Sequence, residues 1–202
     1  SGRPKIALQA INPNQEGKET GEVIDLAGLQ VALREGRRIV LEAPAGRGKT
    51  TTLIQLAERC SGQDELAFPV ELPTWIRSNI DLLEFIASMP AFRSRGVRAD
   101  DLAKIYGAVH CMFLLNGWNE VSDSYSENAV LALAHLERSF PRAGIIVATR
   151  THHTRPPLPG SSRSSLLSLS RQQRAEYLEK ALQSRADQLS VILDGDRVLD
   201  DL

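Results

Sequence analysis

Two kinds of apolar pattern alternate along the chain. Some stretches are apolar at nearly every position over the length of a strand, as strands covered on both faces require: residues 38–41, 109–115 and 144–149. Others repeat apolar residues along one face of a helix: residues 26–33, 51–60, 80–88 and 128–136. Gly36 follows the first of these helices as a terminating residue. The pattern therefore predicts strands and helices in alternation.

Several weaker signals complete this picture. Residues 67–72 form a further strand, and Pro69 places it at an edge of the sheet because proline has no N–H to donate. Asp100 or Asp101 is expected to cap a helix that runs through Tyr106. Residues 156–165, rich in Pro, Ser and Gly, are expected to form a loop before a last strand at 166–169.

This order of elements predicts an α/β fold, a three-layer sandwich with a mainly parallel five-stranded sheet between helices. We divide the chain into a polar N-terminal arm (1–24), a core domain (25–169) and the start of a small helical domain (170–202), which Ser170 opens as a cap. The chain starts without Met and stops in charged sequence, so we expect it to be a segment of a longer protein.

Composition narrows the function classes. Apolar residues make up 42% and charged residues 24%, with a net charge of −1, which implies no strong attraction to nucleic acid or to an anionic membrane. No apolar run approaches the length of a membrane span, and no signal-peptide pattern is visible. We expect a cytoplasmic protein in which the two cysteines, Cys60 and Cys111, are buried and reduced.

The strongest chemical motif follows the first buried strand. Gly46-Arg47-Gly48-Lys49-Thr50 is the second half of a phosphate-binding P-loop, with a strand before it and a helix after it. Small residues let backbone N–H groups converge on a phosphate, Lys49 can reach the terminal phosphates, and the Thr50 hydroxyl can hold Mg²⁺. Ala45 and Thr51 flank these residues in the predicted cofactor site. Ala43 stands where the consensus begins with Gly, and a positive φ there would be unfavourable.

A P-loop needs a partner that handles Mg²⁺ and the attacking water. Asn116 ends the next buried strand, where an Asp usually coordinates the metal, and Glu120 is the carboxylate of the turn that follows. The missing charge predicts weakened Mg²⁺ affinity and slow hydrolysis, with Glu120 orienting or deprotonating water. Asn116-Gly117 is also a strong turn-forming pair, and such a turn would present Glu120.

Other polar residues are weaker candidates. Arg150 follows the strand at 144–149 and is expected to contact the γ-phosphate, with a solvated arginine as the alternative. His152 and His153 lack metal-ligand spacing. Trp75 and Trp118 could stack on a base, but packing is the favoured alternative for both. Arg93, Arg95 and Arg98 could bind a phosphate-rich partner, but a solvated loop is the favoured alternative.

Together these segments resemble the NACHT-type NTPases of the STAND branch of AAA+-related ATPases. The P-loop with its doubled threonine (45–51) is similar to that family's, as are the strand at 68–72 and the sensor strand at 145–150. Residues 114–120 resemble its D-G-x-[DN]-E variant of the Walker B motif, with Asn116 in place of the first Asp. The likeness covers roughly residues 25–185.

The resemblance implies a switch that binds ATP or ADP with Mg²⁺. ADP would hold a closed monomer, and exchange for ATP would open it for homo-oligomerisation with effector and sensor modules that this chain lacks. A second interpretation is a degenerate, non-hydrolysing domain used for protein interaction or oligomerisation, which Asn116 favours. A metabolic P-loop kinase is disfavoured, because no arginine-rich lid segment or substrate motif is found. The sequence therefore leaves open whether the protein is an active ATPase.

Overall fold

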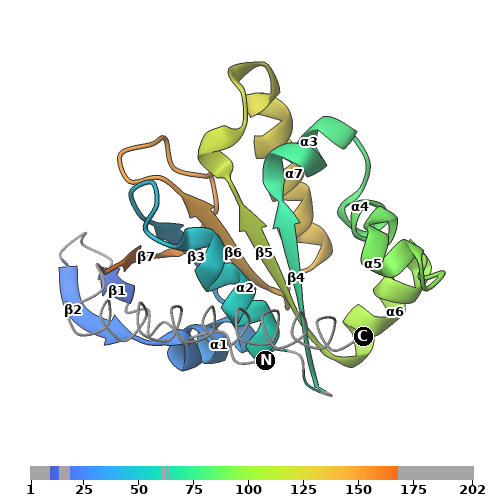
Figure 1. The fold of residues 1–202 in the computed structure, drawn as a ribbon, viewed down its shortest axis with the longest axis horizontal. Helices are drawn as coiled ribbons and strands as arrows, with labels where there is room; N and C mark the ends of the chain where they lie inside the picture. The colour runs from blue at the N-terminus through green and yellow to red at the C-terminus, as the bar shows by residue number, and fades with distance from the viewer. Residues whose placement is uncertain (1–9, 14–18, 61, 63, 168–202) are drawn as a thin grey trace, which may run out of the picture. The chain divides into compact units, whose positions relative to one another are not determined.

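The computed structural model describes residues 10–13, 19–60, 62 and 64–167. In this part of the chain the strands join into one seven-stranded sheet of order β2-β1-β7-β3-β6-β5-β4 (Figure 1). The strands span β1 Ala10–Pro13, β2 Glu19–Ile24, β3 Arg38–Glu42, β4 Glu65–Glu71, β5 His110–Asn116, β6 Gly144–Thr149 and β7 Ser162–Leu166. The neighbours from β7 to β4 are parallel, whereas β1 pairs antiparallel with both β2 and β7.

The parallel part of the sheet has five strands, the number predicted, although β7 begins earlier in the chain than the last predicted strand. Its strongest strands, β5 and β6, are buried along nearly their whole length, which explains why they read as continuous apolar runs. β4 lies at the edge of the sheet, so the prediction from Pro69 is confirmed. β1 and β2 fall within residues 1–24, for which the sequence predicted only a polar arm, and they extend the sheet on the side of β7.

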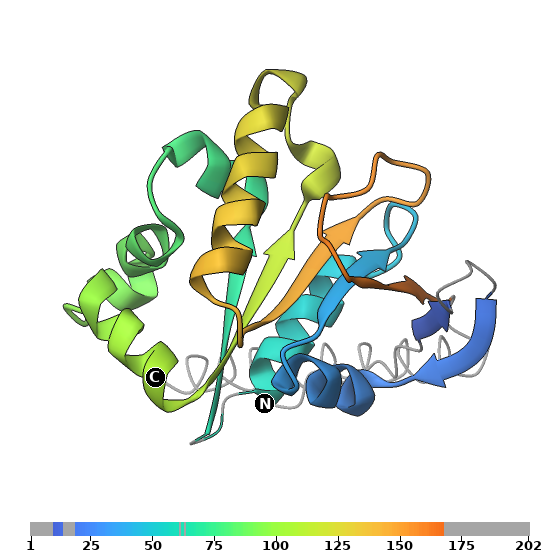
Figure 2. The ribbon, with the colours of Figure 1, turned by 180° about the vertical axis from the view of Figure 1, so that it is seen from behind.

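Helices cover both faces of the sheet. The helices are α1 Leu26–Arg34, α2 Lys49–Arg59, α3 Leu72–Ser78, α4 Leu82–Ser88, α5 Pro90–Arg93, α6 Ala99–Ala108 and α7 Ser126–Ser139. Two 3₁₀ turns are η1 Trp118–Glu120 and η2 Asp123–Tyr125. Helices α1 and α2 lie on the face toward the viewer in Figure 1, and α7 lies on the opposite face, in front in Figure 2. The layers are helix, sheet and helix, as predicted.

Strand β5 shows how one apolar run serves two layers. Phe113 and Leu115 belong to the cluster that also holds Leu133 of α7, while Met112, on the other face, has its sulfur 3.4 Å from the Cys60 sulfur at the end of α2. Successive side chains of a strand point to opposite faces, so every position of β5 must be apolar. Both cysteines are buried and unpaired, which confirms the prediction for them.

Two local predictions hold only in part. Helix α6 is capped by Arg98, and Asp101 lies three residues into it, where its carboxylate accepts the Arg98 N–H at 3.1 Å. Strand β7 begins at Ser162, inside the segment predicted to be a loop, because β3 and β1 on its two sides supply hydrogen bonds for its backbone. The helix predicted from Ser170 onward lies outside the described residues.

Candidate nucleotide-binding site

The loop after β3 leaves the sheet without strain at Ala43. The Ala43 N–H donates to the Thr149 carbonyl at 3.2 Å, and the Ala43 carbonyl accepts the Thr151 N–H at 3.4 Å. Among the described non-glycine residues only Asn79 and His152 have positive φ, so Ala43 does not need the conformation that only glycine adopts easily. The departure from the consensus at this position therefore leaves the backbone of the loop undisturbed.

Glycines shape the rest of the loop. Gly46 and Gly48 have φ of 73° and 90°, in the left-handed region that favours glycine. A Cβ built on either residue meets no described atom within 4 Å, so both backbones face open space. Helix α2 begins at Lys49 with no side-chain cap and no acidic residue in its first turn. Its first N–H groups and the positive end of its dipole are thus available to an anion.

Lys49 lies where the loop meets the helix. Its Nζ donates to the Ala43 carbonyl at 2.9 Å and to the Pro44 carbonyl at 3.1 Å. Partial burial lowers the pKa of Lys49, repulsion from Arg150 lowers it further, and attraction to Glu120 raises it. Arg150 and Glu120, the other two residues predicted to be catalytic, therefore lie close enough to Lys49 to act on it electrostatically.

A small polar network joins the loop to the sheet. The Asn116 amide Nδ2 lies 3.2 Å from the Thr50 hydroxyl and 3.1 Å from both carboxylate oxygens of Glu71. Asn116 ends β5 and Glu71 ends β4, and the two residues are direct partners in the parallel register. The structure thus brings together Thr50 and Asn116, the predicted metal ligands, and adds a carboxylate that was not predicted.

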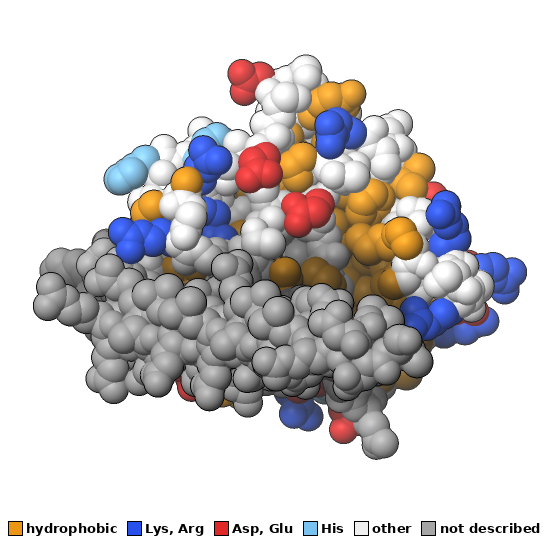
Figure 3. All heavy atoms as spheres, viewed as in Figure 1, with side chains coloured by type: hydrophobic (Ala, Val, Ile, Leu, Met, Phe, Trp, Pro, Cys, Tyr) orange, Lys and Arg blue, Asp and Glu red, His pale blue; other side chains and the backbone are white. Residues whose placement is uncertain are grey.

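The turn after β5 presents Glu120 as expected. Gly117 has φ of 87° and the Glu120 N–H donates to its carbonyl at 2.9 Å, so that residues 118–120 form one 3₁₀ turn. The Glu120 side chain is exposed, and with Glu71, Arg77 and Tyr125 it lines a cavity of about 300 Å³. In the space-filling view acidic side chains stand between the end of β5 and α3 (Figure 3).

The end of β6 contributes a buried and an exposed group. Thr149 is fully buried, and its hydroxyl has no hydrogen-bond partner among the described residues. Arg150, the next residue, is exposed and lies near enough to Lys49 to lower its pKa. Because β3, β6 and β5 are parallel neighbours, their carboxyl ends open at one edge of the sheet, where ligands of this architecture bind.

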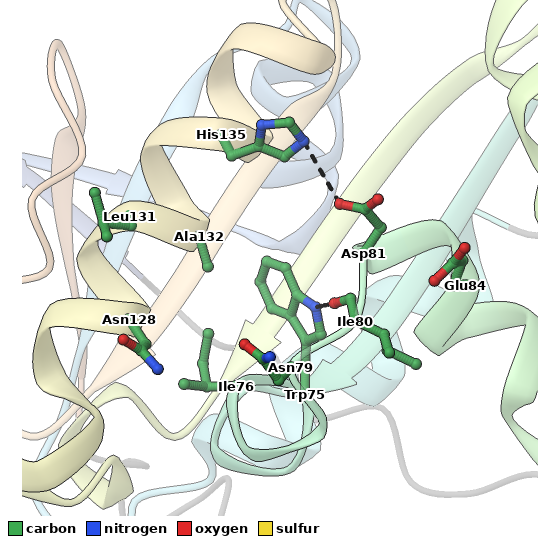
Figure 4. Close-up of a pocket in the computed structure, with 10 residues that line it drawn as sticks. All are labelled: Trp75, Ile76, Asn79, Ile80, Asp81, Glu84, Asn128, Leu131, Ala132 and His135. Atoms are coloured by element: carbon green, nitrogen blue, oxygen red, sulfur yellow. Dashed lines mark hydrogen bonds and ion pairs between the residues drawn. The ribbon is translucent and has the colours of Figure 1, made fainter.

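The weaker candidates take structural roles or lie in solvent. Trp118 is buried and its indole N–H donates to the Thr154 carbonyl at 2.7 Å, while that of Trp75 donates to the Ile80 carbonyl at 3.0 Å (Figure 4). The favoured alternative of packing is confirmed for both tryptophans. His152 and His153 are exposed, and in the described residues no group of three or more His, Cys, Asp or Glu side chains forms a metal site.

A larger cavity, of about 490 Å³, lies between α3, α4 and α7, and none of the residues predicted to be catalytic, cofactor-binding or metal-binding lines it. Its walls include apolar Ile76 and Leu131, and at one end His135 lies 3.6 Å from an Asp81 carboxylate oxygen (Figure 4). The candidate site is instead the open loop around Lys49 and the strand ends beside it.

Sequence reasoning missed Glu71 and Glu42. Glu71 occupies the tip of a parallel strand, so the rule that selected Asn116 and Arg150 could have found it. Glu42 ends β3 directly before the loop, and its buried carboxylate accepts hydrogen bonds from Arg163 of β7, whose Nε lies 3.2 Å away. Arg155 approaches the same carboxylate at 3.9 Å. No local pattern links residue 42 to residues 155 and 163, so only the fold could reveal that Glu42 contacts these two arginines.

No protein-family model matches the chain, and no curated protein is similar to it at a significant level. Among solved structures it is similar to a DNA replication initiation factor (TM-score 0.55, 14% identity, 79% of this chain and 49% of the other). It is also similar to PCH-2 of C. elegans (0.51, 13%, 80% and 46%) and to AMPPCP-bound DnaA of Aquifex aeolicus (0.52, 13%, 79% and 49%). At these identities the likeness concerns the fold.

The fold is therefore the predicted one, an α/β three-layer sandwich around a mainly parallel sheet of the P-loop NTPase kind, which the chain shares with these solved structures. The chain spans about half the length of the solved chains that it matches. None of the helices in the described ranges has the length and hydrophobicity of a membrane span.

Proposed function

We propose that the chain is an ATP- and ADP-binding switch module with slow or impaired hydrolysis. The observation that carries this proposal is the loop at the start of α2, where left-handed glycines, an uncapped helix and Lys49 surround open space. Phosphates would replace the carbonyl oxygens that Lys49 now contacts, at 2.9 and 3.1 Å. A charge-assisted bond to phosphate is stronger than one to a neutral carbonyl, so the exchange favours bound nucleotide.

The roles of the other residues follow from their places. Residues 45–51 would cradle the phosphates, Thr50 and Asn116 would hold Mg²⁺, and Arg150 would contact the γ-phosphate. Glu120 would take a proton from the water that attacks the γ-phosphorus as the bond to the leaving ADP breaks. An amide carries no full charge beside the cation, which supports slow turnover.

The wider assignment rests on the resemblance to NACHT and STAND proteins. In it, residues 25–169 form the nucleotide-binding core, residues 1–24 an N-terminal arm and residues 170–202 the start of a small helical domain. The full-length protein would carry effector and sensor modules, reside in the cytoplasm, and form homo-oligomers when ATP replaces ADP. The near-neutral net charge of −1 supports a role without specific nucleic acid binding.

Calorimetry with ATP and with ADP, each with and without Mg²⁺, tests the proposal. The wild-type chain should bind both nucleotides, and Lys49→Ala should weaken binding by about tenfold or more, since one charge-assisted bond is lost. Lys104→Ala is the matched control, because this lysine is exposed on α6 and, within the described part of the chain, pairs only with Asp101, at 3.8 Å. Failure of the wild-type chain to bind either nucleotide would refute the proposal.

The second candidate function is a non-hydrolysing interaction domain that keeps the fold. The observation that favours it is the Asn116 amide at the strand tip where a carboxylate is usual. A single-turnover measurement of phosphate release decides between the two. A measurable rate, below the typical enzyme value of about 10 per second and lowered further by Glu120→Gln, supports the ATPase switch. Tight, Mg²⁺-independent binding with no release supports the interaction domain.

A further inference from the structure

Three oxygen atoms converge on one hydrogen-bond donor at the edge of the candidate site. The Asn116 Nδ2 lies 3.2 Å from Thr50 Oγ1 and 3.1 Å from Glu71 Oε1 and Oε2. The oxygens come from the start of α2 and the end of β4, and the donor comes from the end of β5. An amide NH₂ carries partial positive charge, so the arrangement is already one that accepts positive charge at this point.

The same three side chains suit a hard divalent cation. Mg²⁺ prefers oxygen ligands and is commonly held by one or two carboxylates together with substrate phosphates and water. Rotation of the Asn116 side-chain amide by half a turn presents Oδ1 in place of Nδ2, because the two ends of the amide are nearly the same shape. The set then offers a hydroxyl, an amide oxygen and a carboxylate, with one full negative charge.

We propose that Glu71 supplies the protein carboxylate for the divalent cation of the bound nucleotide, so that the charge lacking at Asn116 is provided from the neighbouring strand. This inference rests on the proposed nucleotide-binding function and makes its metal site specific. The parallel register supports this inference. Glu71 pairs directly with Asn116, so its carboxylate lies at the same edge of the sheet, one strand away from the position where the metal-binding Asp is usual.

Glu120 is another carboxylate at this edge, and its position separates its role from that of Glu71. Both line the cavity of about 300 Å³ beside the strand ends. Only Glu71 contacts the Asn116 amide that also reaches Thr50, whereas Glu120 acts electrostatically on Lys49. Glu71 therefore serves the cation, and Glu120 remains free to serve the attacking water.

The test compares nucleotide affinity with Mg²⁺ and with chelator, for the wild-type chain and for Glu71→Gln. Glutamine keeps the size of the side chain and an oxygen that accepts the Asn116 N–H, so the fold is retained, which a thermal melt verifies. The gain in ATP affinity on adding Mg²⁺ should fall by roughly 10- to 100-fold in the variant, while affinity in chelator stays the same or rises. Mn²⁺ in place of Mg²⁺ gives a spectroscopic measure of the same loss.

Glu84→Gln is the matched control. It also removes one carboxylate, but Glu84 lies on α4 and lines the cavity of about 490 Å³, away from the candidate site. It should leave the Mg²⁺ effect unchanged. If the wild-type chain binds ATP with a Mg²⁺ effect that Glu71→Gln retains, or with no Mg²⁺ effect at all, the role of Glu71 is overturned and nucleotide binding stands. If the wild-type chain binds no nucleotide, both proposals fail.

Discussion

Glu71 and Asn116 end neighbouring parallel strands in direct register, and the Asn116 amide contacts both carboxylate oxygens of Glu71 at 3.1 Å. The pair connects the edge strand β4 to the strand that carries the turn of Glu120. Through Thr50, at 3.2 Å from the same amide, it also connects the sheet to the phosphate-binding loop. Changes at either residue should therefore alter both the stability of the nucleotide-free protein and the handling of a cation.

The first prediction concerns Asn116→Asp. The new carboxylate would face Glu71, so without nucleotide we expect the free energy of unfolding at pH 7 to fall by roughly 0.2–1 kcal/mol. Like charge raises the pKa of the pair in the folded state, so the deficit relative to wild type should grow as pH rises above about 4. With Mg²⁺ and ATP bound, the deficit should shrink and hydrolysis should accelerate. Urea denaturation and phosphate release measure the two effects.

The double variant Glu71→Gln, Asn116→Asp is the control for this prediction. It keeps one carboxylate and removes the repulsion, so its stability should return toward that of wild type and its response to Mg²⁺ should be retained. An Asn116→Asp protein as stable as wild type at every pH would show that the two side chains do not face each other.

The second prediction concerns the ionisation of Lys49. Burial and Arg150 lower its pKa, and Glu120 partly offsets them. The ammonium form is thus disfavoured in the fold: its cost is fully present below the folded-state pKa and falls away as pH rises from that pKa to the unfolded-state value of 10.5. Arg150→Ala should raise the pKa, Glu120→Gln should lower it, and bound nucleotide should raise it through the phosphate charge. Heteronuclear NMR titration of the Lys49 side chain measures each shift, and equal pKa values in all three proteins would contradict this arrangement.

The third prediction concerns the buried pair of Glu42 and Arg163. Arg163→Met removes the main partner of a carboxylate that is 4% exposed, and we expect a loss of about 2 kcal/mol in the free energy of unfolding. Adding Glu42→Gln should recover part of the loss, because the uncompensated charge is then gone. Arg37→Met, which breaks an exposed pair with Glu35, should cost less than about 0.5 kcal/mol. Similar losses for the two arginine variants in urea denaturation would contradict the prediction.

The fourth prediction concerns Gly144, the first residue of β6. A Cβ there would collide with the backbone of Leu33, whose Cα would lie only 2.8 Å away. Gly144→Ala should destabilise the protein by about 3 kcal/mol or more, since backbone cannot yield as a flexible side chain can. Gly107→Ala in α6, where an added Cβ meets no described atom within 4 Å, should instead stabilise it by roughly 0.5–1 kcal/mol. The two denaturation midpoints should shift in opposite directions.

The fifth prediction concerns the cysteines. Burial raises the pKa of both the Cys60 and Cys111 thiols from 9.0 to about 11. The thiolate fraction at pH 8 is then about one in a thousand, so both should react slowly with a disulfide-exchange reagent until the protein unfolds. Because the thiolate is disfavoured in the fold, stability should decline as pH rises from 9.0 toward 11. Rapid reaction of either thiol in the native protein would contradict its burial.

Much of the fold could be predicted because its signals are local. Residues 109–115 and 144–149 are apolar throughout since the strands β5 and β6 are covered on both faces. Strand β7 could not be predicted in this way, because it contains Ser162 and Ser165 and depends on hydrogen bonds to β3 and β1. A strand that is stabilised by its neighbours' backbones carries no apolar signature of its own.

The sequence by itself determined the alternation of strands and helices, the edge position of β4, and the loop at Lys49 that conforms to a phosphate-binding motif. Each of these follows from residues that are close together in the chain. Only the tertiary structure decided that Glu71 faces Asn116 and Thr50, and that Glu42 pairs with Arg163. These contacts join strand ends and a helix start that are distant along the chain, and the parallel register of the sheet alone brings them to one edge.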